Sequence, residues 1–505
     1  MKAAIIIGDH PIRLNLMEQF KAKGCRVDVF RSFDEVGEVI GYGEVCILPD
    51  QRESDEDTLQ RLENLAKVFP APDPSAPKPV CHLLLHNRSS LWLLQTFDLL
   101  REIPAKFELN AFTLVDFWAK NVICQPNSNQ ATYPHLDRER IDVQSNKTVH
   151  LVIQGFSEMG ESLAYHAALT CHFPNYERDH SLRTRITVID ENIMKRRDAF
   201  IQRYKYLFRH SYYRTIDVKS RSMTQFHEPL YNSSRENFVD VEWEFVDGSA
   251  SHPVVIGKLA FWAKDPGRQL TMVVSGPDDN ANVEQAIALP DALFESDTPV
   301  WVRLHRDIVS RTLGQSPRYR NIHAFGMDSS GYDVHIPVMR MSRLLHYFYA
   351  CSYDARGVPT SFPQEEVEAE WRKAGPLKMR LSNVCNVQTM ATKMHSLGHD
   401  ADDLRAFFAL TEEEIKSLAR TEHNRWCVER LLSGTRACTD EERAAIRKDI
   451  RLKKEYKKNR DAHYDLCAYD ELGVDEKGID VRTYDYDLTA CIPLIVESYL
   501  KEEGR

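Results

Sequence analysis

The chain has 505 residues, a length that fits about three to four domains of roughly 100–200 residues each. Hydrophobic residues make up 43% and charged residues 28%, so a globular protein with a sizeable core is expected. The formal net charge of -10 argues against a general nucleic-acid binder, because a surface that follows phosphates needs an excess of Lys and Arg; it leaves room for one local basic pocket.

The cysteines and apolar runs favour a reduced protein outside the membrane. Cysteines are scattered from Cys25 to Cys491 without a C-x-x-C pair, so neither a zinc ribbon nor a redox pair is indicated. Met1 and Lys2 run into a short apolar stretch without a secretory leader, and no apolar run approaches the roughly 20 residues that cross a bilayer. We therefore expect a soluble cytoplasmic chain.

The first segment alternates strands and helices as an open α/β unit does. Its predicted strands are Ala3–Ile7, Arg26–Phe30, Val45–Leu48 and His82–Leu85. A periodic stretch over residues 12–23 that ends at Gly24 predicts a helix after the first strand. Because buried parallel strands read as continuous apolar runs, we expect a parallel sheet in a Rossmann-like domain over residues 1–125.

A second α/β unit follows a polar crossover at residues 125–147. Its predicted strands are Thr148–Ile153, Arg185–Asp190, Val239–Phe245, Leu270–Ser275, Pro299–Leu304 and Ile322–Phe325. The segment from Arg197 to Glu236 is rich in Tyr, Arg and His and is expected to be an insertion or an extended helix and loop. We assign this unit to residues 147–340, so that the chain holds two doubly wound parallel sheets.

The turn after the first strand of the second unit has the pattern of a phosphate-binding loop. Residues 155–160 fit G-x-[small]-x-x-G between a predicted strand and a predicted helix. Gly155 permits a tight turn, the small Ser157 lets backbone approach a pyrophosphate, and Gly160 lets the helix pack on the strand. The helix N-terminus would offer free N–H groups and a positive dipole to phosphates. The alternative is a structural glycine turn without a ligand.

Acidic residues at two further strand ends extend this candidate site. Asp190 is the acid that would hold ribose hydroxyls, and it stands 35 residues after Gly155 (190 − 155), where about 20 is usual. An inserted loop at residues 171–182 would account for the excess. Asp278 and Asp279 follow a later strand, at the edge of the sheet where doubly wound folds bind ligands.

Over roughly residues 147–325 these features resemble the TrkA-N (RCK) type of regulatory NAD-binding domain, which supplies soluble sensor subunits to potassium transporters and channels. The resemblance implies NAD or a related adenine nucleotide as the ligand, and a homodimer. It does not extend to the first unit, because the turn at residues 8–11 lacks the second and third glycines. The candidate nucleotide-binding residues are Gly155, Phe156, Ser157, Glu158, Met159, Gly160, Asp190, Glu191, Asp278 and Asp279.

Beyond about residue 338 helical periodicity replaces the strand patterns. Helices are predicted at Met341–Phe348, Glu365–Lys373, Val387–His395 and Leu404–Phe408. Thr411 followed by Glu414 has the pattern of a capping box, which opens a helix that runs to about Leu432. We therefore expect an all-helical domain over residues 365–505.

The long helix and the segment after it gather aromatic, basic and imidazole side chains. His423 and Trp426 share one helical turn, and His463 and Tyr469 follow downstream. Such groups suit a flat anionic ligand, because rings stack on it and guanidinium groups neutralise phosphate. The alternative is that His423 and Trp426 form a core pair, with the neighbouring charges solvated.

The same residues resemble the ryanodine-receptor (RyR) domain, a compact helical module for ligands or protein partners. Thr435 and Tyr464 stand where that family commonly has Trp and Pro. The resemblance implies a small anionic or nucleotide-like ligand, or a protein partner. The candidate residues are His423, Arg425, Trp426, Arg430, His463 and Tyr469.

No catalytic or metal-binding residue is assigned from the sequence. The chain has no G-x-S-x-G, H-E-x-x-H, Walker A or kinase signature. His395 and His399 have a spacing that could bind a metal on a helix, but Gly398 interrupts that helix and no third ligand is apparent.

Three hypotheses follow, none of them involving nucleic acid. The preferred one is a cytoplasmic nucleotide-sensing regulatory protein that binds NAD or a related nucleotide at the Gly155 turn and a second ligand or partner at the RyR-like helices. The second is an NAD-dependent oxidoreductase or nucleotide-processing enzyme, which needs an acid/base pair near Asp278 and Asp279. The third is a soluble regulatory subunit or scaffold for an ion transporter in a membrane.

Overall fold

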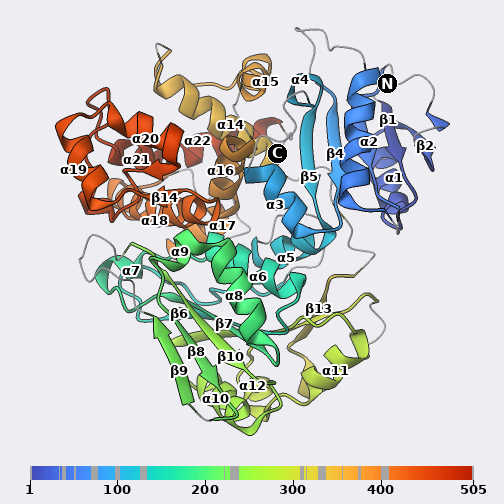
Figure 1. Cartoon of the computed structure of the whole chain (residues 1–505), viewed down its shortest axis with the longest axis vertical. Helices are drawn as coiled ribbons and strands as arrows, with labels where there is room; N and C mark the ends of the chain where they lie inside the picture. Colours follow the sequence, from blue (N-terminus) through green and yellow to red (C-terminus); the bar gives the residue numbers. More distant parts are fainter. Residues whose placement is uncertain are drawn as a thin grey trace.

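Two parallel sheets and a set of C-terminal helices make up the computed structural model of the chain (Figure 1). The first sheet lies at the upper right of the view, the second sheet below it, and the C-terminal helices at the upper left. The structure describes residues 3–32, 35–36, 41–50, 53–69, 78–96, 103–124, 133–220, 222–227, 238–306, 312–313, 315–327, 332, 337–354, 356–373, 377–399 and 409–502. The prediction of two parallel α/β units is confirmed.

The first sheet has five parallel strands in the order β2-β1-β3-β4-β5. The strands are β1 (Ala3–Ile7), β2 (Arg26–Phe30), β3 (Glu44–Ile47), β4 (Val80–Leu84) and β5 (Glu108–Phe112). The helices are α1 (Arg13–Ala22), α2 (Asp55–Val68), α3 (Arg88–Thr96), α4 (Ile103–Lys106) and α5 (Leu114–Cys124). The four predicted strands are present, and β5, with Glu and Asn among its residues, is an addition that apolar runs do not indicate. This strand order is the flavodoxin-like form of the doubly wound fold.

The second sheet has eight strands in the order β13-β12-β11-β6-β7-β10-β8-β9. The strands are β6 (Thr148–Gln154), β7 (Thr184–Asp190), β8 (Tyr213–Asp217), β9 (Ser222–His227), β10 (Val241–Asp247), β11 (Arg268–Val274), β12 (Val300–Arg303) and β13 (Ile322–Phe325). All pairings are parallel except that of β9 with β8. Leaving out β8 and β9, the order is that of dinucleotide-binding sheets, with the switch point between β6 and β11.

Helices and one hairpin complete the second unit. Its helices are α6 (Glu158–Thr170), α7 (Asn175–Arg178), α8 (Ile193–Arg203), α9 (Lys205–Phe208), α10 (Pro253–Ala263), α11 (Asp279–Ile287) and α12 (Asp291–Glu295). The six predicted strands are present, and the loop expected at residues 171–182 contains α7. The expectation of an insertion or extended helix and loop at residues 197–236 is wrong in part, because Thr215 and Ile216 of β8 are buried beside β10 and the hairpin extends the sheet; residues 228–237 lie outside the described ranges.

The C-terminal region is mainly helical. Its helices are α14 (Pro337–Ser352), α15 (Gln364–Lys373), α16 (Leu377–Gln388), α17 (Met390–Ser396), α18 (Glu412–Leu432), α19 (Asp440–Lys448), α20 (Leu452–Arg460), α21 (Arg482–Ala490) and α22 (Ile492–Glu502). The capping box predicted for α18 is present, with Thr411 and Glu414 each bonding the other's backbone N–H. The helix predicted across Val387–His395 is interrupted at Thr389, and the one predicted at Leu404–Phe408 lies outside the described residues.

The expectation of an all-helical C-terminal domain needs correction, because this region also contains a pair of short parallel strands. β14 (Arg436–Ala437) pairs with β15 (Ala462–His463). Gly434 and Asp461 precede them with φ of 86° and 48°, so the chain turns sharply before each strand. This pairing holds the segment that carries His463 against the C-terminal end of α18.

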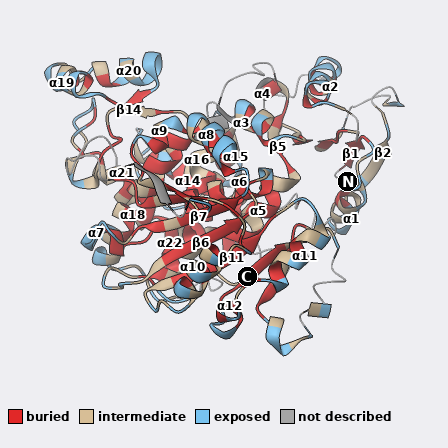
Figure 2. Ribbon diagram, turned by 60° about the horizontal axis from the view of Figure 1, so that its bottom comes forward, coloured by how far each residue is buried: buried red, intermediate tan, exposed pale blue. Residues whose placement is uncertain are grey.

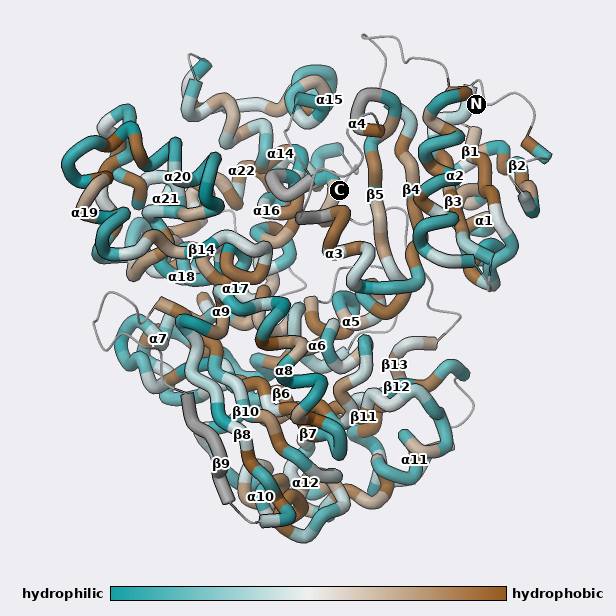
Figure 3. The backbone as a smooth tube through the Cα atoms, viewed as in Figure 1, coloured by the Kyte–Doolittle hydropathy of each residue, from teal (hydrophilic) through white to brown (hydrophobic). Residues whose placement is uncertain are grey.

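One apolar core runs through all three regions. Phe117 of α5, Leu163 of α6 and Leu431 of α18 belong to a single cluster of buried residues. Figure 2 shows the central strands β6, β7 and β11 of the second sheet as mostly buried, and Figure 3 shows hydrophilic residues concentrated on peripheral helices such as α20. The regions are therefore packed as one body, and a ligand between them would contact more than one.

Candidate functional site

The Gly155 turn lies where the strand order of the second sheet reverses. Gly155 donates its N–H to Ile189 O at 2.9 Å, on the β7 side, and Ser275 donates its N–H to Gln154 O at 2.9 Å, on the β11 side. Gly155 has φ +93°, a conformation that favours glycine. The turn thus opens into the crevice where doubly wound sheets bind their ligands.

Gly160 allows the first turn of α6 to sit directly on this loop. A Cβ atom at Gly160 would lie 2.2 Å from Gly155 O, so any side chain would push the helix away. Ser157 Oγ donates to Ser275 O at 3.2 Å, and Ser275 Oγ donates to Gly155 O at 2.9 Å. Within the described structure, no group accepts a hydrogen bond from the N–H of Ser157 or Glu158, so these donors are free for an anion.

Carboxylates in the first turn of α6 oppose an anion. Glu158 and Glu161 both lie there. Burial raises the pKa of Glu158, and the nearby Glu161 raises it further. Arg203 Nη1 pairs with Glu161 Oε2 at 2.7 Å and removes part of the negative charge. The negative charge of these two carboxylates would therefore oppose a phosphate at this turn, although Arg203 offsets part of it.

Asp190 lies beside the turn as predicted, but its carboxylate is already used. Oδ2 accepts the N–H of Phe156 at 2.8 Å and pairs with Arg196 Nη1 at 3.1 Å, and Oδ1 accepts the N–H of Asn192 at 2.8 Å. These bonds fasten the turn to the end of β7. A ribose would share an occupied acceptor, while the adjacent Glu191 is exposed.

Two predicted site residues can contribute only their backbone. Phe156 and Met159 are fully buried. The Phe156 ring packs edge-on against Phe200, with centroids 5.2 Å apart. Their side chains anchor the turn in the core and are not available to a ligand.

The acids predicted after β11 have partners of their own. Asp278 caps α11 by accepting the N–H of Ala281 at 2.8 Å. Asp279 Oδ1 lies 2.6 Å from His305 Nδ1, and these two side chains are 31% and 38% exposed. No pattern in the sequence indicates His305. It follows β12 and meets Asp279 because β11 and β12 are parallel and end at the same edge of the sheet.

The start of α3 in the first unit lies near the start of α6, with Arg203 between them. Arg203 Nη2 lies 3.5 Å from Ser89 Oγ in the first turn of α3, which follows β4. The loop before it is held by Asp55, whose carboxylate accepts the N–H groups of His86 at 2.6 Å and Asn87 at 3.0 Å. The start of α6 thus faces the carboxyl edge of the first sheet.

Five of the six residues predicted for the C-terminal site do come together. The rings of His423 and Trp426 are stacked with their centroids 5.7 Å apart. The centroids of Trp426 and His463 are 5.0 Å apart, and those of His423 and Tyr469 are 5.7 Å apart. The Arg430 guanidinium lies 5.8 Å from the Trp426 ring centroid.

Hydrogen bonds fix the centre of this cluster. His423 is buried, with Nδ1 3.1 Å from Asp485 Oδ2 and Nε2 2.9 Å from Cys467 O. Both ring nitrogens are therefore occupied. The structure gives His423 the packing role that stood as the alternative to ligand binding.

Arg425, the sixth predicted residue, belongs instead to a buried network of charged side chains. It bonds Glu422 Oε1 and Glu429 Oε2, each at 2.8 Å, and Glu422 Oε2 also accepts from Lys393 Nζ at 2.9 Å. Burial opposes the charged carboxylate, but Arg425 and Lys393 outweigh it and lower the pKa of Glu422 to about 2. Removing one member would leave a buried charge unpaired, so the role of Arg425 here is stabilising.

No family model matches the chain, and no curated protein matches it. Among solved structures, a D-lactate dehydrogenase from Treponema pallidum aligns with 74% of this chain and 93% of its own, at 10% sequence identity and a TM-score of 0.19. A TM-score that low supports no inference about fold or function, which therefore rest on the geometry.

One cluster of functional groups was not found by sequence reasoning. Asp116 Oδ1 accepts from Arg88 Nε at 3.1 Å and His166 Nε2 at 3.0 Å, and Arg88 Nη1 donates to Tyr204 at 2.8 Å. Burial alone would raise the pKa of Asp116, but His166 and Arg88 lower it below its ordinary value. The residues come from separate elements, so no local motif could have indicated them.

The described residues contain neither a metal cluster nor a membrane span. No group of three or more His, Cys, Asp or Glu side chains in the described ranges could hold an ion. His395, considered above for its spacing from His399, has Nδ1 2.9 Å from Asp137 Oδ2. No helix in these ranges combines the length and apolarity needed to cross a bilayer.

Proposed function

We propose that the chain is a ligand-responsive regulatory protein that binds NAD or a related adenine nucleotide at the Gly155 turn. The observation that carries this proposal is the position of the turn: it stands at the switch point of a sheet with dinucleotide-binding strand order and has free N–H groups at the start of α6. Asp190 is occupied, so the phosphates, and not the ribose, would supply most of the contacts.

The position of the turn favours a regulatory role because two parts of the chain meet beside it. The start of α6 faces the loop before α3, and Arg203 reaches both Glu161 and Ser89. A nucleotide at the turn would meet both sides and would stabilise one arrangement of the two sheets over another.

Calorimetry with NAD, ADP-ribose and ATP tests the proposal. Ser157 is the N-cap of α6. Asp is also a favoured N-cap residue, so Ser157→Asp adds a negative charge and still suits the start of the helix. We expect wild type to bind at least one of these nucleotides, and Ser157→Asp to weaken that binding about tenfold, or about 1.4 kcal/mol.

The matched control is Thr411→Asp, which places the same acid at the N-cap of α18, away from any glycine turn. It should leave nucleotide affinity unchanged. Failure of all three nucleotides to bind wild type, or equal affinity for wild type and Ser157→Asp, would refute the proposal.

A second candidate, a nucleotide-dependent enzyme, is favoured by the Asp279–His305 pair. An acid bonded to Nδ1 orients an imidazole so that its Nε2 can take a proton, and both residues lie at the carboxyl edge of the sheet. Under this reading, turnover of NAD(H) with a substrate panel, followed at the nicotinamide absorbance band, should fall about 100-fold or more in His305→Asn. Absence of turnover in wild type would leave the regulatory proposal alone.

A further inference from the structure

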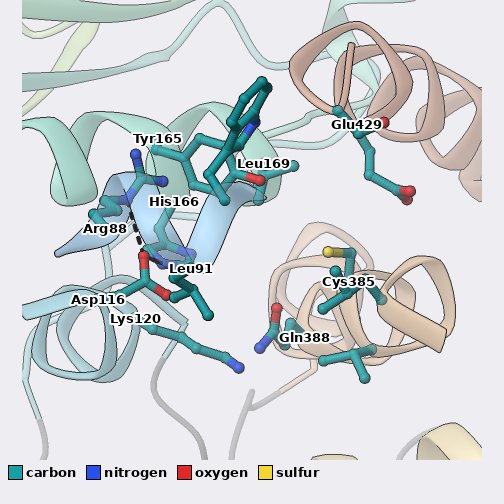
Figure 4. A pocket seen from close by; sticks show the side chains of 14 residues that line it. Arg88, Leu91, Asp116, Lys120, Tyr165, His166, Leu169, Cys385, Gln388 and Glu429 are labelled. Atoms are coloured by element: carbon teal, nitrogen blue, oxygen red, sulfur yellow. Dashed lines mark hydrogen bonds and ion pairs between the residues drawn. The ribbon is translucent and has the colours of Figure 1, made fainter. Parts of the chain in front are cut away.

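A cavity of about 80 Å³ lies where the three regions of the chain meet (Figure 4). Helices α3 and α5 of the first unit, α6 of the second, and α16 and α18 of the C-terminal region form its walls. Its lining includes Lys120, His166, Gln388, Asp116, Glu429 and Cys385. The cavity is separate from the Gly155 turn, which contributes no lining residue.

Two buried polar side chains on its wall have an atom without a partner. Gln388 is 6% exposed and its Nε2 has no hydrogen bond. His166 is 5% exposed; its Nε2 bonds Asp116 and its Nδ1 has no hydrogen bond. Burial outweighs the Asp116 carboxylate and lowers the pKa of His166, so Nδ1 of the neutral ring is a free acceptor. A buried polar atom left unpaired is costly, and a bound molecule would satisfy both.

The charge balance of the wall favours an anion. Asp116 is paired with Arg88, and Glu429 with Arg425. Lys120 forms no ion pair in the described structure. No described carboxylate therefore balances the charge of its ammonium. Figure 4 shows the Lys120 side chain extending from α5 toward α16, where Gln388 lies.

Much of the remaining wall is apolar, and the space is small. Its apolar lining residues include Leu91, Leu169, Leu381, Val384 and Cys385. A volume of about 80 Å³ exceeds the roughly 10–15 Å³ that one water needs, yet it is far below a nucleotide site.

We propose that this cavity binds a small organic anion, a short-chain carboxylate, whose carboxylate lies between the Lys120 ammonium and the Gln388 amide. Its hydrocarbon part packs on the apolar wall. A hydroxyl on the ligand, or a water that enters with it, donates to His166 Nδ1. Because the bound anion touches helices of all three regions, its occupancy stabilises their mutual packing.

Saturation-transfer NMR on the full chain tests this site with butyrate, 3-hydroxybutyrate, inorganic phosphate and the uncharged 1-butanol as probes. We expect one of the two carboxylates to bind at least tenfold more tightly than 1-butanol or phosphate. Lys120→Met and Gln388→Leu should each weaken that binding at least tenfold. Lys448→Met, at an exposed lysine in the last turn of α19, should leave it unchanged.

Three results would overturn the proposal. The first is the absence of saturation transfer to both carboxylates in wild type. The second is equal carboxylate binding by wild type, Lys120→Met and Gln388→Leu, each shown by circular dichroism to be folded. The third is a preference for phosphate, which has no apolar part.

Discussion

The turns that follow β1 and β6 occupy the same place in two parallel sheets, yet they are built differently. After β1, a Cβ atom at Gly8 would lie 2.0 Å from Leu48 O, so this glycine serves packing between strands. The Asp9 N–H donates to Asp50 Oδ1 at 3.0 Å, and Arg13 pairs with Asp9 at 2.8 Å. Side chains thus fill the space around the first turn and pair with its polar groups.

After β6, glycines at both ends of the loop bring helix and turn into contact. Gly160 packs on Gly155 O, and Asp190 fastens the loop through Phe156 while leaving the N–H groups at the start of α6 free. The same strand–turn–helix unit can therefore close on itself or stay open to an anion, depending on which groups satisfy the hydrogen bonds of its backbone.

The largest effects are expected at Gly160 and Gly8, the two glycines that pack against a backbone oxygen. Gly160→Ala and Gly8→Ala should each destabilise the chain by about 3 kcal/mol, because each new methyl group would meet a backbone oxygen. Gly257→Ala in α10 is the control, since a Cβ atom there would have no atom within 4 Å and alanine favours helices. Urea denaturation measures all three, and a Gly160→Ala variant as stable as wild type would contradict the packing role.

Asp190→Ala should come next in size. It removes the acceptor of the buried Phe156 N–H and the partner of Arg196, so we expect a loss of about 2 kcal/mol. Exposed Glu191→Ala beside it should change stability by less than about 0.5 kcal/mol. Equal melting temperatures for the two variants would show that Asp190 does not hold the turn.

Asp55 holds the loop before α3, and its contribution to stability can be tested by changing the pH. Burial alone would raise the pKa of Asp55, but hydrogen bonds from Ser90, His86 and Asn87 lower it below 3.8. The folded carboxylate therefore adds stability above pH 3.8, and this contribution is lost as the pH falls through the lowered pKa.

Asp55→Asn should accordingly cost about 1 kcal/mol above about pH 5, and the difference from wild type should shrink below about pH 3. Denaturant unfolding at both pH values measures it. A difference that is independent of pH would show that the charge on Asp55 does not contribute.

The smallest effect concerns the carboxylates at the start of α6. Glu158→Gln removes a negative charge beside the free N–H groups, so nucleotide affinity should rise about threefold in calorimetry. Glu413→Gln makes the same change in the first turn of α18 and should have no effect. Unchanged affinity in Glu158→Gln would place the phosphates elsewhere.

Local pattern predicted much of this structure, and long-range contact decided the rest. Continuous apolar runs such as that of β6 and the Thr411 capping box identified strands and a helix start, because those signals are contained in a few residues. The occupied state of Asp190 and the pairing of His305 with Asp279 depend on residues brought together by the sheet edge. The Lys120–Gln388 cavity joins α5 and α16, and no spacing in the sequence indicates that contact.

Hydrogen–deuterium exchange with and without saturating ADP-ribose tests the central claim most directly. If a nucleotide binds at the Gly155 turn between the two sheets, amides in residues 154–162 should exchange more slowly, together with those in residues 86–92 across the crevice. Unchanged exchange in residues 154–162 would contradict the account, as would protection confined to the C-terminal helices.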